Sequence, residues 1–381
     1  MKRKYQVIIV GAGPAGSTLA YHLAIGGTSV LVLDRAVFPR YKCCAGGLTV
    51  KAAKLLDINI NGLADDVISG AIVTFKGSKP YYGHSASPIM YTVMREGFDH
   101  ALVKRAQDAG ADILEEVEAH GIQVSTRGVE VSTAMGSFWS EFVAGADGAG
   151  SRVAKAMNIA KHDAHIVGLE SEIRVTREEL AKWKSRIAID IGRTQGGYGW
   201  VFPKADHLSV GISCRADKAK GLRRVFREYL DSLKFGRHTI ARCAAGLLPV
   251  CVGQTVVAQG RAIVLGDAAG LADPLTGEGM HNAILSAQLG AAVIQKALSS
   301  GEAALGDYSE TVAATIIPQM KLACVFSKML SQLPVKLFRV LNQDERVWKA
   351  CCYMLRGEMD YVTIKNRVSS LGKLYSLISH I

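Results

Sequence analysis

The sequence predicts an α/β fold, α+β overall, with a doubly wound parallel sheet, a second antiparallel lobe and a helical C-terminus. Apolar β-forming runs before residue 35 and after residue 260 lead into glycine-rich turns, and alternating runs fill the middle of the chain. Helical spacing then dominates after residue 280. With 381 residues, 49% of them hydrophobic, the chain is long enough to bury the cores of two lobes.

The first strand and its turn carry the clearest motif. Residues 5–10 form an apolar β run, and a G-x-G-x-x-G motif follows at Gly11, Gly13 and Gly16. The first glycine allows a tight turn, the second lets the backbone approach a pyrophosphate, and the third lets helix and strand pack closely. The helix N-terminus then offers free N–H groups to the diphosphate. We therefore predict a Rossmann-type site for an adenine dinucleotide.

Later runs extend this sheet. The second strand, residues 29–33, ends at Asp34, where an acid can bind a ribose 2′-hydroxyl. We expect residues 91–95 to return toward the sheet, and helical spacing over residues 96–110 leads to the next strand at 111–114. This order makes a further βαβ step.

Two more acids stand at predicted strand ends. Short β runs between residues 121 and 144 lead to Asp147, and a buried strand at 262–265 leads to Asp267. An Asp in this position can accept a hydrogen bond from a sugar or ribityl hydroxyl. Gly279 precedes a long helix that begins near Met280, and its N–H group can face an electron-rich ring or an anion.

The middle of the chain predicts the antiparallel lobe. Strand-like alternation fills residues 166–257 around a basic helix between 216 and 235, and a strand at 70–75 lies outside the nucleotide sheet. Three aromatic residues are spaced two apart and share one face of a strand: Tyr198, Trp200 and Phe202. The returning strand carries Leu208, Val210 and Ile212, also two apart. We expect these six to form an aromatic–aliphatic wall, with plain sheet core as the alternative interpretation.

The cysteine pattern and the apolar runs indicate in which cellular compartment the protein works. The eight cysteines include no C-x-x-C pair and no zinc spacing, which is typical of a reduced, cytoplasmic protein without a structural metal. The basic N-terminus followed by an apolar run resembles a secretory signal, but that run is the first strand of the nucleotide site, so we reject export. No run of 18 apolar residues predicts a membrane-spanning helix.

The net charge of +11 is concentrated at the end of the chain. Residues 319–381 contain ten Lys and Arg against four acids. No nucleic-acid-binding module accompanies this charge, so we predict no nucleic-acid partner. Two interpretations stay open: helices that touch anionic lipid at a membrane surface, and the solvated faces of packed helices.

Together the motifs resemble the flavin-dependent hydroxylase superfamily. Its signatures are G-x-G-x-x-G, a central Asp-Gly and a later Gly-Asp, which correspond here to 11–16, 147–148 and 266–267. Within it, the chain is similar to the geranylgeranyl reductase family through Y-K-C-C-A-G-G-L at 41–48, Y-G-W-V-F-P-K at 198–204 and D-P-L-T-G-E-G at 273–279. Related halogenases carry a W-x-W-x-I-P variant of the second motif.

The resemblance implies FAD as the cofactor, a hydroxylase-like architecture of two lobes, and a set of site residues. It implies FAD contacts at Ala15, Asp34, Cys44, Ala45, Gly47, Arg95, Asp267, Gly279 and Met280, in addition to the glycines of the first turn and Asp147. Tyr198, Trp200 and Phe202 would line a prenyl channel. The family acid at position 34 is often Glu, and Asp34 is one methylene shorter. Cys44 is a candidate catalytic residue, with packing beside the flavin as the alternative.

The predicted domains are discontinuous. Residues 1–70, 92–165 and 255–318 form the FAD-binding domain, residues 71–91 and 166–254 the substrate domain, and residues 319–381 a helical segment. No second G-x-G-x-x-G follows a strand, so no dedicated NAD(P)H domain is predicted. Electrons from NAD(P)H, a ferredoxin or another reduced carrier all remain open.

The leading hypothesis is an FAD-dependent reductase of isolated C=C bonds in a geranylgeranyl or polyprenyl chain. That chain would belong to a lipid, a diphosphate, a chlorophyll-type ester or a quinone. The main alternative is an FAD-dependent monooxygenase that hydroxylates an aromatic or quinone ring. A non-catalytic flavoprotein that binds prenyl lipid is a weaker alternative. An NAD dehydrogenase leaves the Asp-Gly and Gly-Asp motifs unexplained.

Overall fold

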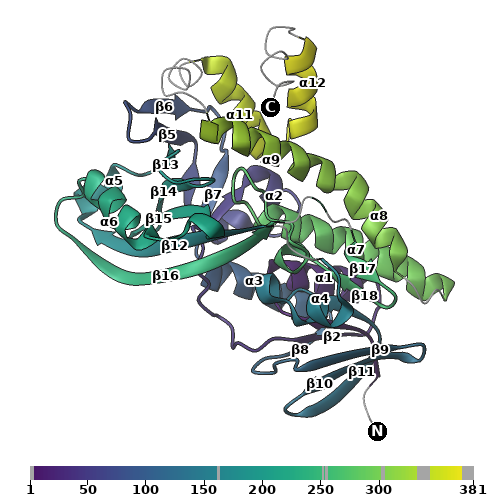
Figure 1. Ribbon diagram of the computed structural model, residues 1–381. Helices are drawn as coiled ribbons and strands as arrows, with labels where there is room; N and C mark the ends of the chain where they lie inside the picture. The colour runs from purple at the N-terminus through teal and green to yellow at the C-terminus, as the bar shows by residue number, and fades with distance from the viewer. Residues whose placement is uncertain are drawn as a thin grey trace.

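The protein folds into two lobes on separate sheets, and C-terminal helices run from the first lobe to the second (Figure 1). The computed structural model describes residues 4–160, 164–250, 253, 256–301, 305–332 and 344–370. The predicted combination of a parallel Rossmann-type sheet with an antiparallel sheet is confirmed. The division into FAD-binding and substrate domains, which assigns functions to these parts, stays a prediction.

The first sheet has the main order β17-β18-β11-β1-β2-β8. Its strands are β1 (Lys4–Val10), β2 (Val30–Leu33), β8 (Asp112–Leu114), β11 (Gly136–Gly145), β17 (Ala258–Gln259) and β18 (Ala262–Val264), and β9 (Gly121–Ser125) and β10 (Gly128–Thr133) extend β11. The central strand β1 is parallel to both β2 and β11. Its apolar run is buried, as expected for a central strand of a parallel sheet whose two faces are both covered.

Helices α1 (Pro14–Ile25), α3 (Arg95–Asp108) and α7 (Met280–Ser300) pack on this sheet (Figure 1). The turn before α1 depends on its glycines: Gly11 has a φ of +99°, and a Cβ at Gly16 would overlap the carbonyl oxygen of Gly11. Short helices α2 (Val50–Ala53) and α4 (Arg152–Met157) complete this lobe.

One strand belongs to a different sheet than predicted. The expectation that residues 91–95 return to the parallel sheet is wrong, because β7 (Met90–Val93) pairs antiparallel with β3 (Gly47–Thr49) and β4 (Ala64–Ile68) in a separate small sheet. Those two neighbours occupy both edges of β7, so it has no edge left for β2 or β8. The strand predicted at 111–114 does join the parallel sheet beside β2.

The second sheet has seven strands in the order β16-β12-β15-β14-β13-β5-β6. They are β5 (Gly70–Phe75), β6 (Tyr81–His84), β12 (Ala164–Val175), β13 (Arg186–Ile191), β14 (Tyr198–Pro203), β15 (Leu208–Arg215) and β16 (His238–Val250). Helices α5 (Arg177–Ala181) and α6 (Leu222–Ser232) lie over one face (Figure 1). The opposite face carries the aromatic residues of β14.

The predicted aromatic–aliphatic wall is wrong in its aliphatic half. The register of β14 and β15 places Trp200 opposite Gly211 and Val201 opposite Val210. Because directly paired residues point to the same side of a sheet, Leu208, Val210 and Ile212 lie on the face away from the aromatic residues. There they form a core with Phe226 and Tyr229 of α6.

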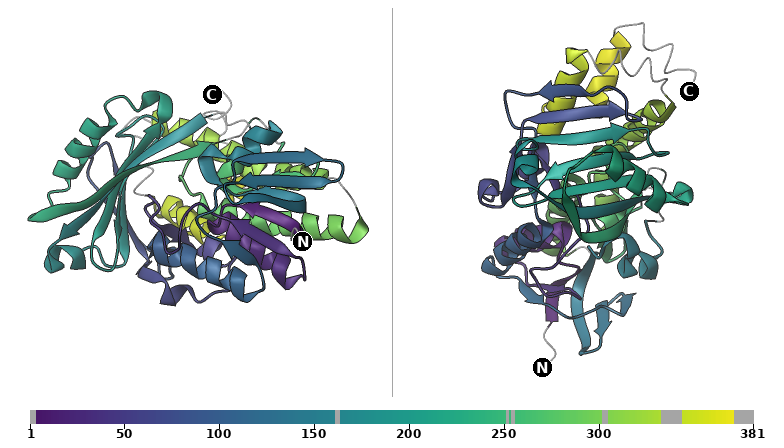
Figure 2. Two further views of the ribbon diagram at one scale, coloured as in Figure 1. Left: turned by 90° about the horizontal axis from the view of Figure 1, so that it is seen from below. Right: turned by 90° about the vertical axis from the view of Figure 1, so that its left-hand side faces the viewer.

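The C-terminal helices are α8 (Gly306–Thr315), α9 (Ile317–Gln332), α11 (Glu345–Arg356) and α12 (Tyr361–Ser370). Figure 2 places α11 beside β5 and β6, where the Trp348 indole N–H donates to the carbonyl of His84 over 2.8 Å. Across the described ranges, none of the helices is long and apolar enough to cross a bilayer. Lys336, Arg339 and Lys373 of the basic tail lie outside the described residues.

The glycine at position 211 generates a prediction about stability. A Cβ there would overlap the Trp200 ring, so Gly211→Ala must displace the indole and should destabilise the fold by about 1–3 kcal/mol. Urea unfolding followed by circular dichroism measures this loss. Gly97→Ala is the control, because Gly97 lies in α3 with open space around its Cα and alanine there should be neutral or stabilising. Equal midpoints for the two variants would contradict the packing argument.

Candidate functional site

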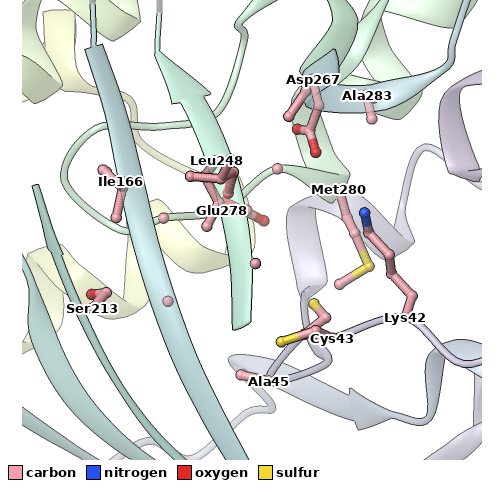
Figure 3. A pocket seen from close by; sticks show the side chains of 18 of the residues that line it. Lys42, Cys43, Ala45, Ile166, Ser213, Leu248, Asp267, Glu278, Met280 and Ala283 are labelled. Atoms are coloured by element: carbon pink, nitrogen blue, oxygen red, sulfur yellow. The ribbon is translucent and has the colours of Figure 1, made fainter. Parts of the chain in front are cut away.

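A cavity of about 1650 Å³ lies between the two lobes. Ligand pockets commonly measure roughly 300–1000 Å³, so this cavity has room for more than one bound molecule. Every predicted site residue lines it except Gly16, which packs against Gly11 instead. Figure 3 shows Lys42, Asp267 and Met280 on one side of the pocket, and Ile166 and Leu248 on strands of the second lobe.

The glycine turn and the second strand form one end of the cavity. Asp34 accepts a hydrogen bond from the Ala12 N–H over 2.6 Å and another from the Ala36 N–H over 2.9 Å. These bonds fix the carboxylate beside the turn, and each of its oxygens keeps a further acceptor position for a ribose hydroxyl. The shorter side chain of Asp34, compared with Glu, therefore still lies where an adenine dinucleotide needs an acceptor.

A buried ion cluster lies next to this turn. The Asp99 carboxylate is fully buried, and Arg95 binds both of its oxygens over 2.8 Å. Arg40 binds Asp99 through Nη2 over 2.9 Å, and Nη2 also lies closest to the space where a Gly13 Cβ would be. Burial opposes the charge of Arg95, but the Asp99 carboxylate outweighs it and raises the Arg95 pKa. Arg95 therefore stays cationic.

Two buried polar atoms at this end have no protein partner within the described ranges: Arg40 Nη1 and Asp147 Oδ1. Because an unpaired buried polar group costs about 1–3 kcal/mol, such atoms point to a missing ligand. A cationic N–H donor near the glycine turn suits a diphosphate, and a carboxylate oxygen suits a hydroxyl group. Burial also raises the pKa of Asp147. The residues present therefore fit an adenine dinucleotide.

Asp267 lies further along the same cavity. Burial raises the pKa of its carboxyl, and the positive charges of Lys42 and Arg95 oppose that shift. In Figure 3 the Lys42 side chain extends toward Asp267 and Met280. Asp267 lies in the short 3₁₀ helix of residues 266–269, which begins two residues beyond the end of β18, and Gly279 is the N-cap of α7. The two residues therefore lie after a buried strand and before a long helix, as the sequence predicts, and their contacts with a cofactor stay a prediction.

The loop that contains Cys44 is attached to the second lobe through Glu170. The backbone N–H of Cys44 donates to Glu170 Oε2 over 2.8 Å, and the Ser209 hydroxyl donates to Oε1 over 2.6 Å. Glu170 lies on β12 and is only 4% exposed. The Cys44 sulfur accepts a contact from the Gly46 N–H at 3.4 Å. One carboxylate therefore holds this loop against the antiparallel sheet.

The aromatic residues of β14 face the same cavity. The rings of Tyr198 and Trp200 meet edge to face with centroids 6.1 Å apart, and the Trp200 indole donates to Ser209 over 3.3 Å. A Cβ at Gly47 would lie 2.6 Å from the Phe202 ring, so Phe202 packs on the first residue of β3. Tyr198 donates to the carbonyl of Thr276, and burial, reinforced by Asp273, raises its pKa. This hydroxyl stays protonated.

Two of the C-terminal helices also line the cavity. Ser327, Leu330 and Ser331 of α9 and Cys351, Met354 and Leu355 of α11 contribute to its wall. Tyr361 of α12 donates to Asp273 over 2.9 Å, which ties this helix to the D-P-L-T-G-E-G loop. Helices α9 and α11 are therefore part of the wall of the site.

Sequence reasoning also missed Arg40, Asp99 and Glu170. Arg40 had a local signal, because it stands in a short loop after the strand that ends at Asp34. Glu170 and Glu172 share one face of a strand and Leu169 lies on the other, and this alternation does not tell a buried acid from an exposed one. Across the described ranges, no three His, Cys, Asp or Glu residues come together as a metal site.

Comparison with known proteins agrees with this geometry. The FAD-binding domain family matches residues 4–230, which is more than half of the chain. The chain belongs to this family. It is also 30% identical to a digeranylgeranylglycerophospholipid reductase of Methanopyrus kandleri over 319 residues, 78% of this chain and 82% of that protein. It is 27% identical to the chloroplastic geranylgeranyl diphosphate reductase of Oryza sativa over 321 residues, 78% of this chain and 68% of that protein.

A solved structure extends the likeness to the fold. A geranylgeranyl bacteriochlorophyll reductase-like protein from Thermoplasma acidophilum aligns with a TM-score of 0.81 at 21% identity, covering 92% of this chain and 96% of that one. The protein is thus an FAD-dependent oxidoreductase related to the geranylgeranyl reductases, as the motifs predict. Bound FAD supplies hydride transfer chemistry, and the residues at the glycine turn, Asp34, Arg40 and Asp147 are those that would hold it.

Arg40 provides a test of the diphosphate end. Arg40→Met removes the unpaired cationic donor while Arg95 still neutralises Asp99, so FAD affinity should fall roughly tenfold to a hundredfold. Titration of the apoprotein with FAD, followed by quenching of flavin fluorescence, measures the Kd. Arg177→Met, at an exposed site on α5, is the control and should leave the Kd unchanged. An unchanged Kd for Arg40→Met would mean that Arg40 serves only to balance Asp99.

Proposed function

We propose that this protein reduces isolated C=C bonds in a geranylgeranyl or polyprenyl chain. The chain is carried by a lipid, a diphosphate, a chlorophyll-type ester or a quinone. One observation supports this most directly: the aromatic face of β14 lines the same cavity as the loops of the FAD-binding lobe. The relatedness to reductases of geranylgeranyl groups points to the same substrate class.

The apolar side chains that line the cavity suit a hydrocarbon chain. Beyond the aromatic residues, the cavity is bounded by Ile187 and Ile189 of β13 and by Leu330, Met354 and Leu355 of the C-terminal helices. A prenyl chain offers no hydrogen bonds, so its affinity must come from buried apolar area, at about 25 cal/mol per Å². A wall assembled from two lobes and the C-terminal helices provides that area and excludes water from the reacting bond.

The residues of this chain have three tasks in such a reaction. Trp200 and Phe202 hold the alkene against the site, and the hydrogen bond from Trp200 to Ser209 fixes the indole. Glu170 fixes the Cys44 loop relative to that ring. Arg95 and Lys42 keep positive charge near Asp267 and the cavity. These cations favour an anionic form of a bound cofactor.

An anaerobic experiment tests the function. The purified flavoprotein is reduced with dithionite and mixed, in separate cuvettes, with geranylgeranyl diphosphate and with a prenylated lipid. We expect flavin absorbance to return without oxygen, and the substrate mass to rise by two hydrogens per reduced bond. Absorbance spectra and mass spectrometry measure the two outcomes.

Two other results would assign a different function. If the flavin is reoxidised only when air is admitted, and oxygen then appears in an aromatic or quinone substrate, the protein is a hydroxylase. If prenyl lipid binds without any flavin reoxidation in either condition, the protein is a lipid-binding flavoprotein.

Trp200 tests the substrate wall separately from the cofactor. Trp200→Ala removes aromatic area that would contact the chain, worth about 1.5–3 kcal/mol, so kcat/KM should fall roughly tenfold to a hundredfold. The flavin content, measured from absorbance per mole of protein, should remain close to that of the wild type. Tyr82→Ala is the control, because Tyr82 is exposed on β6 of the same sheet. Equal loss of turnover and flavin would make Trp200 a purely structural residue.

A further inference from the structure

A second, very small cavity lies behind the loop of residues 41–44. It measures about 10 Å³ and is lined largely by charged side chains, among them Glu170, Glu172, Lys204 and His207. Its size is close to the smallest space that holds one buried water molecule. Cys44 and Glu170 line both this side cavity and the main cavity. The loop is therefore a thin partition between the two spaces.

His207 indicates that the side cavity suits one water molecule. The residue is 7% exposed, its Nδ1 lies 2.7 Å from Asp206, and its Nε2 is buried without a hydrogen-bond partner within the described part of the chain. A buried ring nitrogen needs a partner, and a water in the side cavity provides one. His207 thus places a group that can gain or lose a proton on the wall of this cavity.

Lys204 and the outer acids complete the cluster. The Lys204 ammonium donates to the carbonyl of Val93 over 2.7 Å and lies 3.9 Å from Asp65. Burial lowers its pKa, which eases proton exchange with neighbouring groups. On the outer side, Arg242 pairs with Glu96 at 3.6 Å and with Glu172 at 3.9 Å. Both acids line the side cavity, and the Glu96 carboxylate is 41% exposed, so this end reaches solvent.

We propose that this charged side cavity is the route by which the proton consumed by the reaction enters from solvent, with His207 and Glu170 passing it to the main cavity. The inference rests on the proposed function. Reduction of one C=C bond breaks its π bond and forms two C–H bonds, one with the hydride that the reduced cofactor supplies and one with a proton. Glu170, which lines both cavities, passes that proton to the reacting bond. Water in the side cavity, resupplied through His207, reprotonates Glu170.

The test compares the wild-type holoenzyme with Glu170→Gln and His207→Ala. Each is reduced, mixed anaerobically with the prenyl probe that reoxidises the wild type, and followed by flavin absorbance in H₂O and in D₂O. We expect reoxidation to slow about tenfold or more in both variants, because general acids commonly contribute on the order of a hundredfold or more. The solvent isotope effect should exceed that of the wild type. Added imidazole should restore part of the rate in His207→Ala only.

Controls separate a proton route from a structural role. His120→Ala removes an exposed histidine of the first lobe and should behave as the wild type, with or without imidazole. Wild-type reoxidation rates in both variants would overturn the route. So would a slow His207→Ala whose rate neither imidazole nor D₂O changes. A wild-type flavoprotein that no prenyl probe reoxidises would instead overturn the proposed function, and the route with it.

Discussion

The candidate site depends on one buried carboxylate. Glu170 accepts hydrogen bonds from the Cys44 backbone of one lobe and from Ser209 of the other, and Ser209 in turn receives the Trp200 indole. A buried acid is costly unless its oxygens are satisfied, and here both have donors from the elements that must be aligned. Glu170 therefore links the Cys44 loop directly to the sheet that carries the aromatic face.

Glycines shape the sheet that carries this carboxylate. On one face, Gly211 of β15 leaves the space into which the Trp200 ring fits, and on the other, Gly199 of β14 leaves space for the Tyr229 ring of α6. Each large ring is thus matched by a missing side chain on a neighbouring residue. As a result, one face of the sheet lines the cavity and the other face forms the core of the second lobe.

The cavity is formed jointly by the two lobes and the C-terminal helices. The first lobe contributes cationic and hydroxyl-binding groups, the second contributes the aromatic face, and α9 and α11 contribute apolar side chains. The Tyr361–Asp273 hydrogen bond joins the last helix to the loop before α7. Polar and apolar walls therefore meet in one cavity, and neither lobe contains the whole site. Ligand sites between domains commonly have this arrangement.

The sequence by itself determined the parallel strands, the glycine turn, the acids at strand ends and the relatedness to flavin-dependent reductases, because these depend on local patterns within a few residues. Tertiary structure decided which face Leu208, Val210 and Ile212 occupy, which sheet receives β7, and that the C-terminal helices wall the cavity. It also decided the partners of Glu170 and Arg40. The register between strands and the pairing of distant segments decide these features. The periodicity of one segment cannot show them, because it is identical whichever face is buried and whichever segment is the partner.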